Sequence, residues 1–305
     1  MRNILLLYNP VAGDGQFRFS LDRFMEIFSE KDYEVRMFRS KESGDMAAYL
    51  KDYDFTDTEA LFVAGGNGTI NEVVGALMRL GRRVPIGLIP AGIENDFAKA
   101  LGFGKELEDN LTELARMEPV QVDVACANNQ YFINMCTGGA LADIIQVSDD
   151  MRAVLGRGAY YLKGMSSLHR AKRFRLKIAA DGDVYEDEFA LFLIINGKFN
   201  KLDPENGAVV DDLSDGTFDF IAVKADGLAK LAKALVQIFR REPVEDQSIL
   251  HLSAKHFQVE LLGEERDMAV EIDGETGPSF PLDIEVHQQA LDFFVGKTTH
   301  VPRGT

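Results

Sequence analysis

The sequence predicts two domains of different class: an α/β domain built on a parallel sheet, then a domain of antiparallel strands forming a sandwich or a barrel. The 305 residues suit two domains at roughly 150 residues each. In the first third of the chain, short apolar runs alternate with helical patterns, as in βαβ units. After about Pro119, strand patterns separated by short turns take over, which is typical of antiparallel sheets.

The first domain begins with a continuous apolar run over residues 3–8, as expected of a strand that is buried on both faces. A glycine-rich turn follows over residues 9–15, and apolar residues then recur at helical spacing from Phe17 to Phe28. The same alternation continues to residue 101. It predicts strands over residues 33–38, 60–64 and 85–89, and helices over residues 45–50, 71–80 and 95–101.

The second domain is predicted from short runs of strand character, with turns such as Asp181-Gly182 and Asp273-Gly274 between them. The predicted strands cover residues 120–125, 131–135, 173–179, 184–196, 217–223, 257–262, 268–272 and 282–286, and two helices cover about 160–171 and 228–240. We therefore divide the chain into residues 1–122, completed by the tail 290–305, and a β-rich domain over residues 123–289.

Acidic side chains outnumber basic ones by 49 to 33, which gives a formal net charge of −16. This composition argues against nucleic acid as a partner, because phosphate contacts need clustered Lys and Arg. Any membrane contact would need a local patch. The two cysteines, Cys126 and Cys136, are expected to be buried thiols in a reducing compartment. We see no targeting segment or bilayer-spanning run and expect a cytoplasmic protein.

The strongest local signal is the loop from Gly65 to Thr69, which reads Gly-Gly-Asn-Gly-Thr between a predicted strand and a predicted helix. Glycines permit positive φ and let backbone N–H groups approach a ligand, and a helix N-terminus favours anions. Taken alone, the loop fits a phosphate site and a tight strand-to-helix turn equally well. It matches neither the P-loop nor the spacing of the dinucleotide fingerprint.

Two further loops follow strands of the same predicted sheet, one from Asn9 to Gly13 and one from Pro90 to Ala98. Each alone is an ordinary turn. Ligands of open α/β sheets bind at the carboxyl ends of the strands. Three such loops at one edge therefore outline an anion-binding crevice.

The chain carries, in order, the segments NPVAG, GGNGTINEV, PAGIENDFAKALG, VDVACANNQYFINM, DDLSDGTFDF and EIDGE. This ordered set spans nearly the whole chain. It resembles the diacylglycerol kinase catalytic family, and more narrowly its small bacterial YegS/DgkB-like lipid kinases. The resemblance implies a Rossmann-like parallel sheet of the NAD kinase and diacylglycerol kinase type, a C-terminal antiparallel β-sandwich-like domain, and an active site in the cleft.

The resemblance also implies that the γ-phosphate of ATP is transferred to the hydroxyl of diacylglycerol or a related lipid, with Mg²⁺ as cofactor. Phosphoryl transfer depends mainly on positioning and charge neutralisation, which suits such loops. Glu72, just after Asn71, could also fix the loop or cap the helix that follows it. By analogy the nucleotide would contact Asn9, Pro10, Gly13, Ser40, Gly65, Gly66, Asn67, Gly68, Thr69, Asn71, Glu72, Ile93 and Asn95.

Acidic residues of the second half carry the remaining implied roles. Glu275 is our favoured general base for the lipid hydroxyl, with Asp273 close behind, although without the family an acidic hairpin turn is more often simply solvated. Asp215 would give a carboxylate to a structural Mg²⁺, and Asp212 and Thr217 would give backbone oxygens. A type I turn explains that loop equally well. Asp96 and Asp123 match acidic positions that support phosphate and metal in relatives.

Two loops depart from the family pattern. Asn67 stands where the family has Asp, Ile93 replaces a Thr, and Glu94 replaces a small residue. Asn keeps hydrogen-bonding capacity and loses the charge that would help hold Mg²⁺. Besides the lipid kinase, we keep two alternatives. One is a kinase of a soluble substrate such as NAD, because NAD kinases share a GGDGT-like loop and an Asn-Glu pair. The other, motivated by Asn67 and Ile93, is a catalytically weakened regulator that binds nucleotide or lipid.

A lipid acceptor requires peripheral contact with a membrane, and relatives suggest a homodimer. One stretch of this acidic chain is locally basic and could face anionic headgroups, although a solvated face is the more common explanation. It comprises Arg152, Arg157, Lys163, His169, Arg170, Lys172, Arg173, Arg175 and Lys177.

Overall fold

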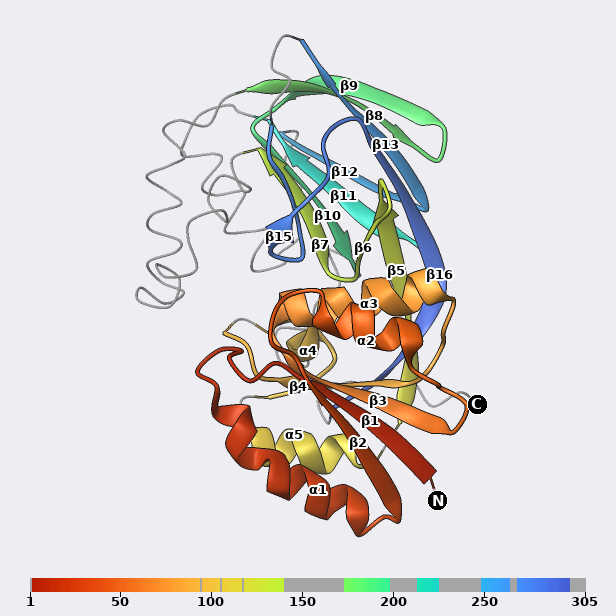
Figure 1. Ribbon diagram of the computed structural model, residues 1–305. Coiled ribbons are helices and arrows are strands. Elements are labelled where there is room, and N and C mark those ends of the chain that lie inside the picture. The colour runs from red at the N-terminus through yellow and green to blue at the C-terminus, as the bar shows by residue number, and fades with distance from the viewer. Residues whose placement is uncertain are drawn as a thin grey trace. The chain divides into compact units, whose positions relative to one another are not determined.

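The computed structural model describes residues 2–93, 95–104, 106–116, 118–139, 173–197, 213–224, 248–263 and 268–296 (Figure 1). The chain divides into two compact units. Within the described residues, the first unit contains those up to Val124, those at 213–215 and those from Gln288 on. The second unit contains Ala125 to residue 197 and Gly216 to His287. The two predicted helices at 160–171 and 228–240 lie outside the described residues.

The first unit is built on four parallel strands in the order β2-β1-β3-β4. The strands are β1 (Arg2–Tyr8), β2 (Tyr33–Arg39), β3 (Thr58–Gly65) and β4 (Ile86–Pro90). β1 and β3 are inner strands, and their apolar runs are almost wholly buried, as sequences of doubly covered strands require. The last part of β16 (Leu282–Phe294) joins this sheet, with Phe293 in parallel register with Ile86.

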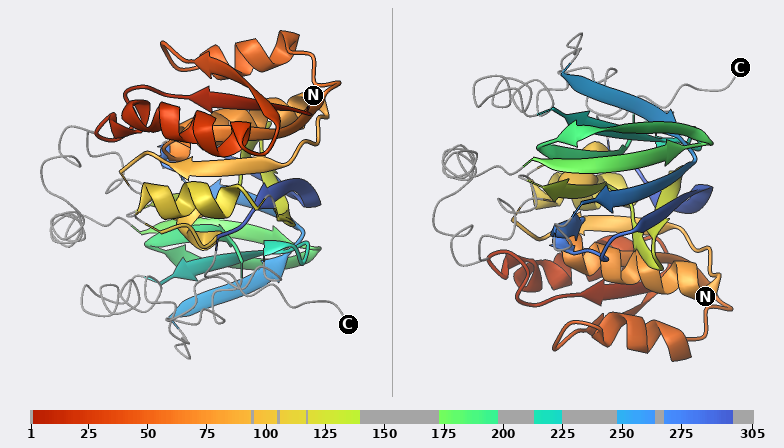
Figure 2. Two further views of the ribbon diagram at one scale, coloured as in Figure 1. Left: turned by 90° about the horizontal axis from the view of Figure 1, so that it is seen from below. Right: turned by 90° about the horizontal axis from the view of Figure 1, so that it is seen from above.

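Helices cover both faces of this sheet. In Figures 1 and 2, α1 and α5 lie on one face and α2 and α3 on the other. The buried rings of Phe24 and Phe28 pack on Phe62 of β3, with centroids 5.3 and 4.6 Å apart. The helices are η1 (Gln16–Ser20), α1 (Leu21–Ser29), α2 (Asp45–Asp52), α3 (Asn67–Leu80), α4 (Asp96–Ala100) and α5 (Leu107–Leu114).

The second unit is an antiparallel β-sandwich. One sheet has the order β12-β11-β10-β7-β14-β15, and the other contains β16-β13-β8-β9. β5 (Pro119–Ala127) runs from the first unit into the second and pairs with β6. The other strands are β6 (Gln130–Phe132), β7 (Met135–Gly139), β8 (Phe174–Ala180), β9 (Asp183–Phe189), β10 (Leu191–Asn196), β11 (Phe218–Val223), β12 (Ile249–Ala254), β13 (His256–Leu262), β14 (Val270–Ile272) and β15 (Glu275–Thr276).

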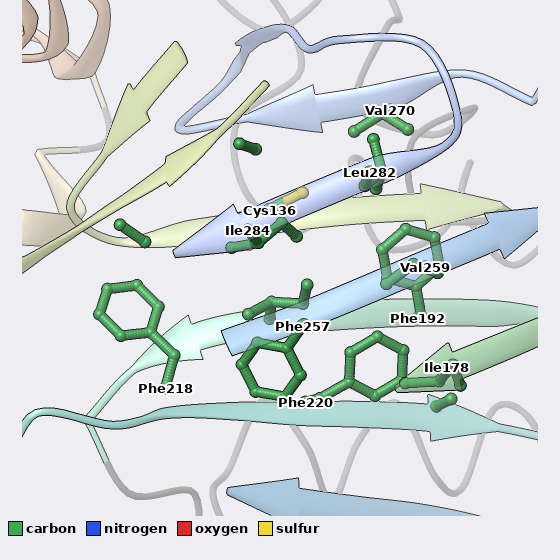
Figure 3. Close-up of a cluster of buried hydrophobic side chains, with 14 of the residues drawn as sticks. Cys136, Ile178, Phe192, Phe218, Phe220, Phe257, Val259, Val270, Leu282 and Ile284 are labelled. Carbon is green, nitrogen blue, oxygen red and sulfur yellow. The ribbon is translucent and has the colours of Figure 1, made fainter. Parts of the chain in front are cut away.

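The core of this unit lies between the two sheets and is rich in phenylalanine (Figure 3). Phe192 and Phe220 come from neighbouring strands of one sheet and stack with nearly parallel rings, 5.7 Å between centroids. Phe257 reaches them from the other sheet, 5.8 Å from Phe220. Cys136 is buried in this core, whereas Cys126 is only partly buried, so the prediction of two buried thiols holds for one of them.

The predicted fold class is therefore confirmed, and several element boundaries are corrected. The helix expected at 71–80 begins at Asn67, directly after the glycine pair. The expected strand 184–196 is two strands, β9 and β10, that belong to different sheets. The expected strand 131–135 breaks at Ile133, where the backbone turns to bind a side chain described below. α5 and β12 were not predicted.

Candidate active site

The first glycine-bearing loop follows β1 and is held by the side chain of Asn9. The Asn9 Oδ1 accepts the Val11 N–H at 3.0 Å, which closes an Asx turn over Pro10. The Asn9 Nδ2 lies 3.5 Å from the Thr69 Oγ1, so this loop contacts the start of α3. One residue thus ties together two of the three loops that the sequence places at this sheet edge.

The second loop joins β3 to α3 and contains Gly65 and Gly66. A Cβ on Gly65 would meet the side chain of Thr69 at 2.4 Å, so glycine there lets Thr69 fold back over the turn. The first N–H groups of α3, a 14-residue helix, have no carbonyl partner within the helix. The side-chain oxygens of Asn67 and Asn71 are buried, and no group of the described residues hydrogen-bonds to them.

The third loop follows β4 and packs directly on the other two. A Cβ on Gly13 would lie 2.4 Å from the Ala91 carbonyl oxygen, and one on Gly92 would lie 2.5 Å from the Gly66 Cα. The loop is held by Asn95, which adopts a left-handed φ of 53°. Its Oδ1 accepts the Gly92 N–H at 2.8 Å and its Nδ2 donates to the Gly92 carbonyl at 2.7 Å.

The three loops therefore form one cluster, in which the backbones of neighbouring loops approach one another closely at glycine residues. We call it the loop cluster (residues 9–15, 65–69 and 90–95, of which Glu94 lies outside the described residues). It lies at the carboxyl ends of β1, β3 and β4 (Figure 1). Backbone N–H groups beside a helix N-terminus form an environment that suits a phosphate group.

Ser40 and Glu72 belong to neighbouring elements of the same unit. Ser40 is buried at the end of β2, and its N–H donates to the Tyr8 carbonyl at 3.1 Å. The Glu72 Oε1 accepts the Ala47 N–H at 2.9 Å. Glu72 therefore caps the first turn of α2 from α3, a different helix from the one that follows its own loop.

Asp123 is fully buried on β5. Its Oδ1 accepts the backbone N–H of Gln289 at 2.7 Å, and Gln289 interrupts β16 with a φ of 52°. The side chains of Gln288 and Gln289 both approach the Ser214 carbonyl at 3.4 Å. Asp123 thus lies next to the strand that meets the loop of Asp215. Sequence reasoning did not single out Gln289, whose contribution is a backbone N–H and leaves no side-chain signal.

The predicted cation loop is described only in part. Asp215 is partly buried, and the Thr217 Oγ1 accepts a hydrogen bond from Ser253 at 3.1 Å. Asp212 and the side chain of Asp96 lie outside the described residues. Among the residues that are described, no group of three or more His, Cys, Asp or Glu side chains is arranged to hold a metal ion.

In the second unit, Asp273 is a buried anchor. Its Oδ2 accepts the Ile133 N–H at 2.9 Å, and its Oδ1 accepts the N–H groups of Asn134 and Met135 at 3.0 and 2.8 Å. Burial raises the pKa of Asp273 from 3.8 to about 6, while the three N–H donors act in the opposite direction. The same burial, with the charges of Asp273 and Glu271 nearby, raises the pKa of the Cys136 thiol.

Glu275 is two residues further along and is exposed. It opens β15 after a turn in which Asp273 and Gly274 have left-handed φ values of 48° and 92°. Ile272 and Glu275 face each other across this hairpin. Asp273 and Glu275 therefore differ in their burial. The Asp273 carboxylate is buried and bound by backbone N–H groups, whereas Glu275 is exposed.

Two residues in the described part of the basic stretch pair with acidic side chains. Arg175 pairs with Glu186 at 2.7 Å and Lys177 with Glu260 at 2.9 Å across strands of the sandwich. The members from Arg152 to Lys172 lie outside the described residues.

Family models and relatives agree on the family. The diacylglycerol kinase catalytic domain matches residues 3–127, and the YegS C-terminal NAD kinase beta sandwich-like domain matches residues 134–295. A diacylglycerol kinase of Bacillus subtilis is 32% identical over 92% of this chain and 92% of its own length. The chain belongs to the diacylglycerol kinase catalytic family. It is a lipid kinase of the bacterial YegS/DgkB-like type.

Other relatives extend this similarity over the whole fold. A diacylglycerol kinase of Staphylococcus aureus is 29% identical over 95% of this chain and 91% of its own length. A crystal structure of a diacylglycerol kinase from Bacillus anthracis covers 97% of both chains with a TM-score of 0.78 and 28% identity. Among the described residues of this lipid kinase, no helix is long and apolar enough to cross a bilayer.

Proposed function

We propose that this lipid kinase transfers the γ-phosphate of ATP to the hydroxyl of diacylglycerol or a related lipid alcohol in a Mg²⁺-dependent reaction. The observation that carries the proposal is the loop cluster, in which glycines let three loops and the N-terminus of α3 converge. The names of the relatives support diacylglycerol as the acceptor. Such a reaction would return diacylglycerol to phospholipid synthesis in the cytoplasm.

Two observations indicate that the loop cluster fits a nucleotide phosphate. A Cβ at Gly13 or Gly92 would collide with neighbouring backbone, so the closeness of the loops depends on glycine. The buried oxygens of Asn67 and Asn71 have no hydrogen-bond partner among the described residues, and a buried polar group without one is costly. The residues that would hold the phosphates are Asn9, Gly13 and the segment from Gly65 to Asn71.

Glu275 is the residue that we assign as general base. It would accept the proton of the lipid hydroxyl while the hydroxyl oxygen bonds to the γ-phosphorus and the bond to the β-phosphate oxygen breaks. Glu275 is exposed, in contrast to the buried Asp273. Asp273 is a positioning residue in this proposal, because its oxygens already accept three backbone hydrogen bonds.

Mg²⁺ would neutralise charge on the transferring phosphate. Carboxylate and backbone oxygens are the ligands that such a hard cation prefers. We assign Asp212, Asp215 and Thr217 to a structural cation and Asp96 and Asp123 to support of phosphate and metal. These assignments rest on the family pattern, and no step of the proposed reaction depends on them.

The proposal is tested by phosphate transfer from radiolabelled ATP. The purified chain and its Glu275→Gln variant would be assayed with Mg²⁺ and a panel of lipid alcohols in mixed micelles, with NAD as a soluble acceptor. We expect a labelled lipid that the variant fails to make. Labelled NAD would favour the soluble-substrate alternative. ATP binding without any product would favour the regulator and would make Asn67 and Ile93 the first positions to revert.

A further inference from the structure

Several exposed apolar side chains lie in the segments that follow β1 and β4. Six large apolar side chains of the described residues are exposed, and three of them lie in the segments that follow β1 and β4. They are Val11, Phe19 and Ile93, with 76, 69 and 62% of their surface exposed. Exposed apolar side chains that gather on one surface mark a binding face, whereas single scattered ones need no explanation.

The geometry brings these residues to one edge of the sheet. Val11 belongs to the loop that packs on the Ala91-Gly92 backbone, next to Ile93. Phe19 lies on η1, which continues the Val11 segment. Its neighbour Phe17 is buried against Tyr8, so the short helix directs one ring inward and the other outward. Val11 and Ile93 therefore belong to loops that follow the carboxyl ends of β1 and β4, and Phe19 lies on the short helix that continues the first of these loops.

The charge beside Phe19 suits a bilayer surface. The Arg18 guanidinium lies 4.6 Å from the centre of the Phe19 ring. Such a pair is amphipathic, since the ring can enter the acyl region while the guanidinium stays at the phosphate level. The chain as a whole carries a formal charge of −16 and is not drawn to anionic lipid by its net charge. Insertion of apolar side chains would therefore supply most of the attraction.

We propose that Val11 and Phe19 form an insertion patch that docks the first unit on a lipid bilayer. The inference rests on the proposed function, because a water-insoluble acceptor presents its hydroxyl at the membrane surface. The loops that would hold the phosphate must then approach that surface. Phosphate contacts in the loop cluster use backbone N–H groups, so the outward side chains of Val11 and Phe19 are available to the membrane.

The chain contains no tryptophan, so one substitution creates a single fluorescent reporter. Phe19→Trp would be compared with Val184→Trp, which replaces a residue with 60% of its surface exposed on β9 of the other unit. Both would be mixed with phosphatidylcholine vesicles containing one-fifth phosphatidylglycerol, with and without brominated acyl chains. We expect a blue shift and bromine quenching for Phe19→Trp alone, and retention of both in high salt.

Two further measurements separate the patch from the catalytic proposal. Phe19→Ser should lower partitioning into the same vesicles about tenfold or more, whereas Val184→Ser should leave it unchanged. Phe19→Ser should also slow phosphorylation of vesicle-borne lipid and retain activity on a short-chain acceptor dispersed in water. Vesicle binding with no quenching at position 19, or binding that high salt abolishes, would overturn the patch. Lack of any lipid product would count against the proposed function, and the fluorescence result would still decide the patch.

Discussion

Asp273 and Met135 bind each other twice. The Asp273 Oδ1 accepts the Met135 N–H at 2.8 Å, and the Asp273 N–H donates to the Met135 carbonyl at 2.9 Å. This reciprocal pair fastens the hairpin of Glu275 to the break between β6 and β7. Because the carboxylate also receives the N–H groups of Ile133 and Asn134, the position of the hairpin depends on Asp273.

The first prediction distinguishes Asp273 from Glu275 by how substitution of each changes the stability of the protein. Asp273→Ala should lower the free energy of unfolding by about 3 kcal/mol, because one buried and two partly buried N–H groups lose their acceptor. Glu275→Gln should change it by no more than about 0.5 kcal/mol, since the side chain is exposed, and should reduce activity by about 10²-fold or more. Urea unfolding and the transfer assay measure the two effects. An Asp273→Ala variant of normal stability and no activity would indicate that Asp273 itself reacts.

The second prediction concerns pH. Burial raises the pKa of Asp273 from 3.8 to about 6, so the folded state binds more protons than the unfolded state between about pH 4 and pH 6. The free energy of unfolding therefore falls as the pH rises through this window, by about 2 kcal/mol from this group. Asp273→Asn removes the titration, so the difference in stability between variant and parent should change by that amount from pH 4 to pH 6. A pH-independent difference would show that the N–H donors cancel the effect of burial.

The third prediction concerns the contact between loops. Gly92→Ala would place a Cβ 2.5 Å from the Gly66 Cα and 2.9 Å from the Asn95 Oδ1, which already accepts the Gly92 N–H. We expect a loss of about 1–3 kcal/mol in the free energy of unfolding and weaker ATP binding. Gly104→Ala is the matched control, because nothing lies within 4 Å of its added methyl group. Equal effects of the two substitutions on ATP affinity would show that the loops need not approach one another so closely.

The local sequence pattern was sufficient to predict strands that are buried on both faces and turns that contain glycine. β1 and β3 were predicted because their inner positions in the sheet demand unbroken apolar runs. The boundary between β9 and β10 was missed, because Ala190, the one residue between the two strands, is not a typical turn residue. The two strands are distinguished only by their pairing in different sheets of the sandwich. The start of α3 was predicted too late, since Asn67 and Gly68 are poor helix formers.

The candidate site likewise has parts that the sequence could predict and parts that it could not. Its glycine loops are visible in the sequence, whereas the partners of its buried carboxylates are distant along the chain. The N–H groups that bind Asp273 come from residues 138 to 140 positions away, and the one that binds Asp123 is 166 positions away. A backbone N–H has no residue-type preference, so neither pair could be identified from the sequence.

The last prediction concerns Glu72, whose carboxylate accepts the Ala47 N–H in the first turn of α2. Glu72→Ala should lower the free energy of unfolding by about 1 kcal/mol, as loss of a helix cap does, and should speed hydrogen exchange at the Ala47 amide. Glu72→Gln keeps an acceptor oxygen and should retain most of the protection. Exchange measured residue by residue distinguishes this tertiary cap from a general loss of stability. Unchanged protection of Ala47 in Glu72→Ala would mean that another group caps α2, and the role of Glu72 would then lie in the loop cluster.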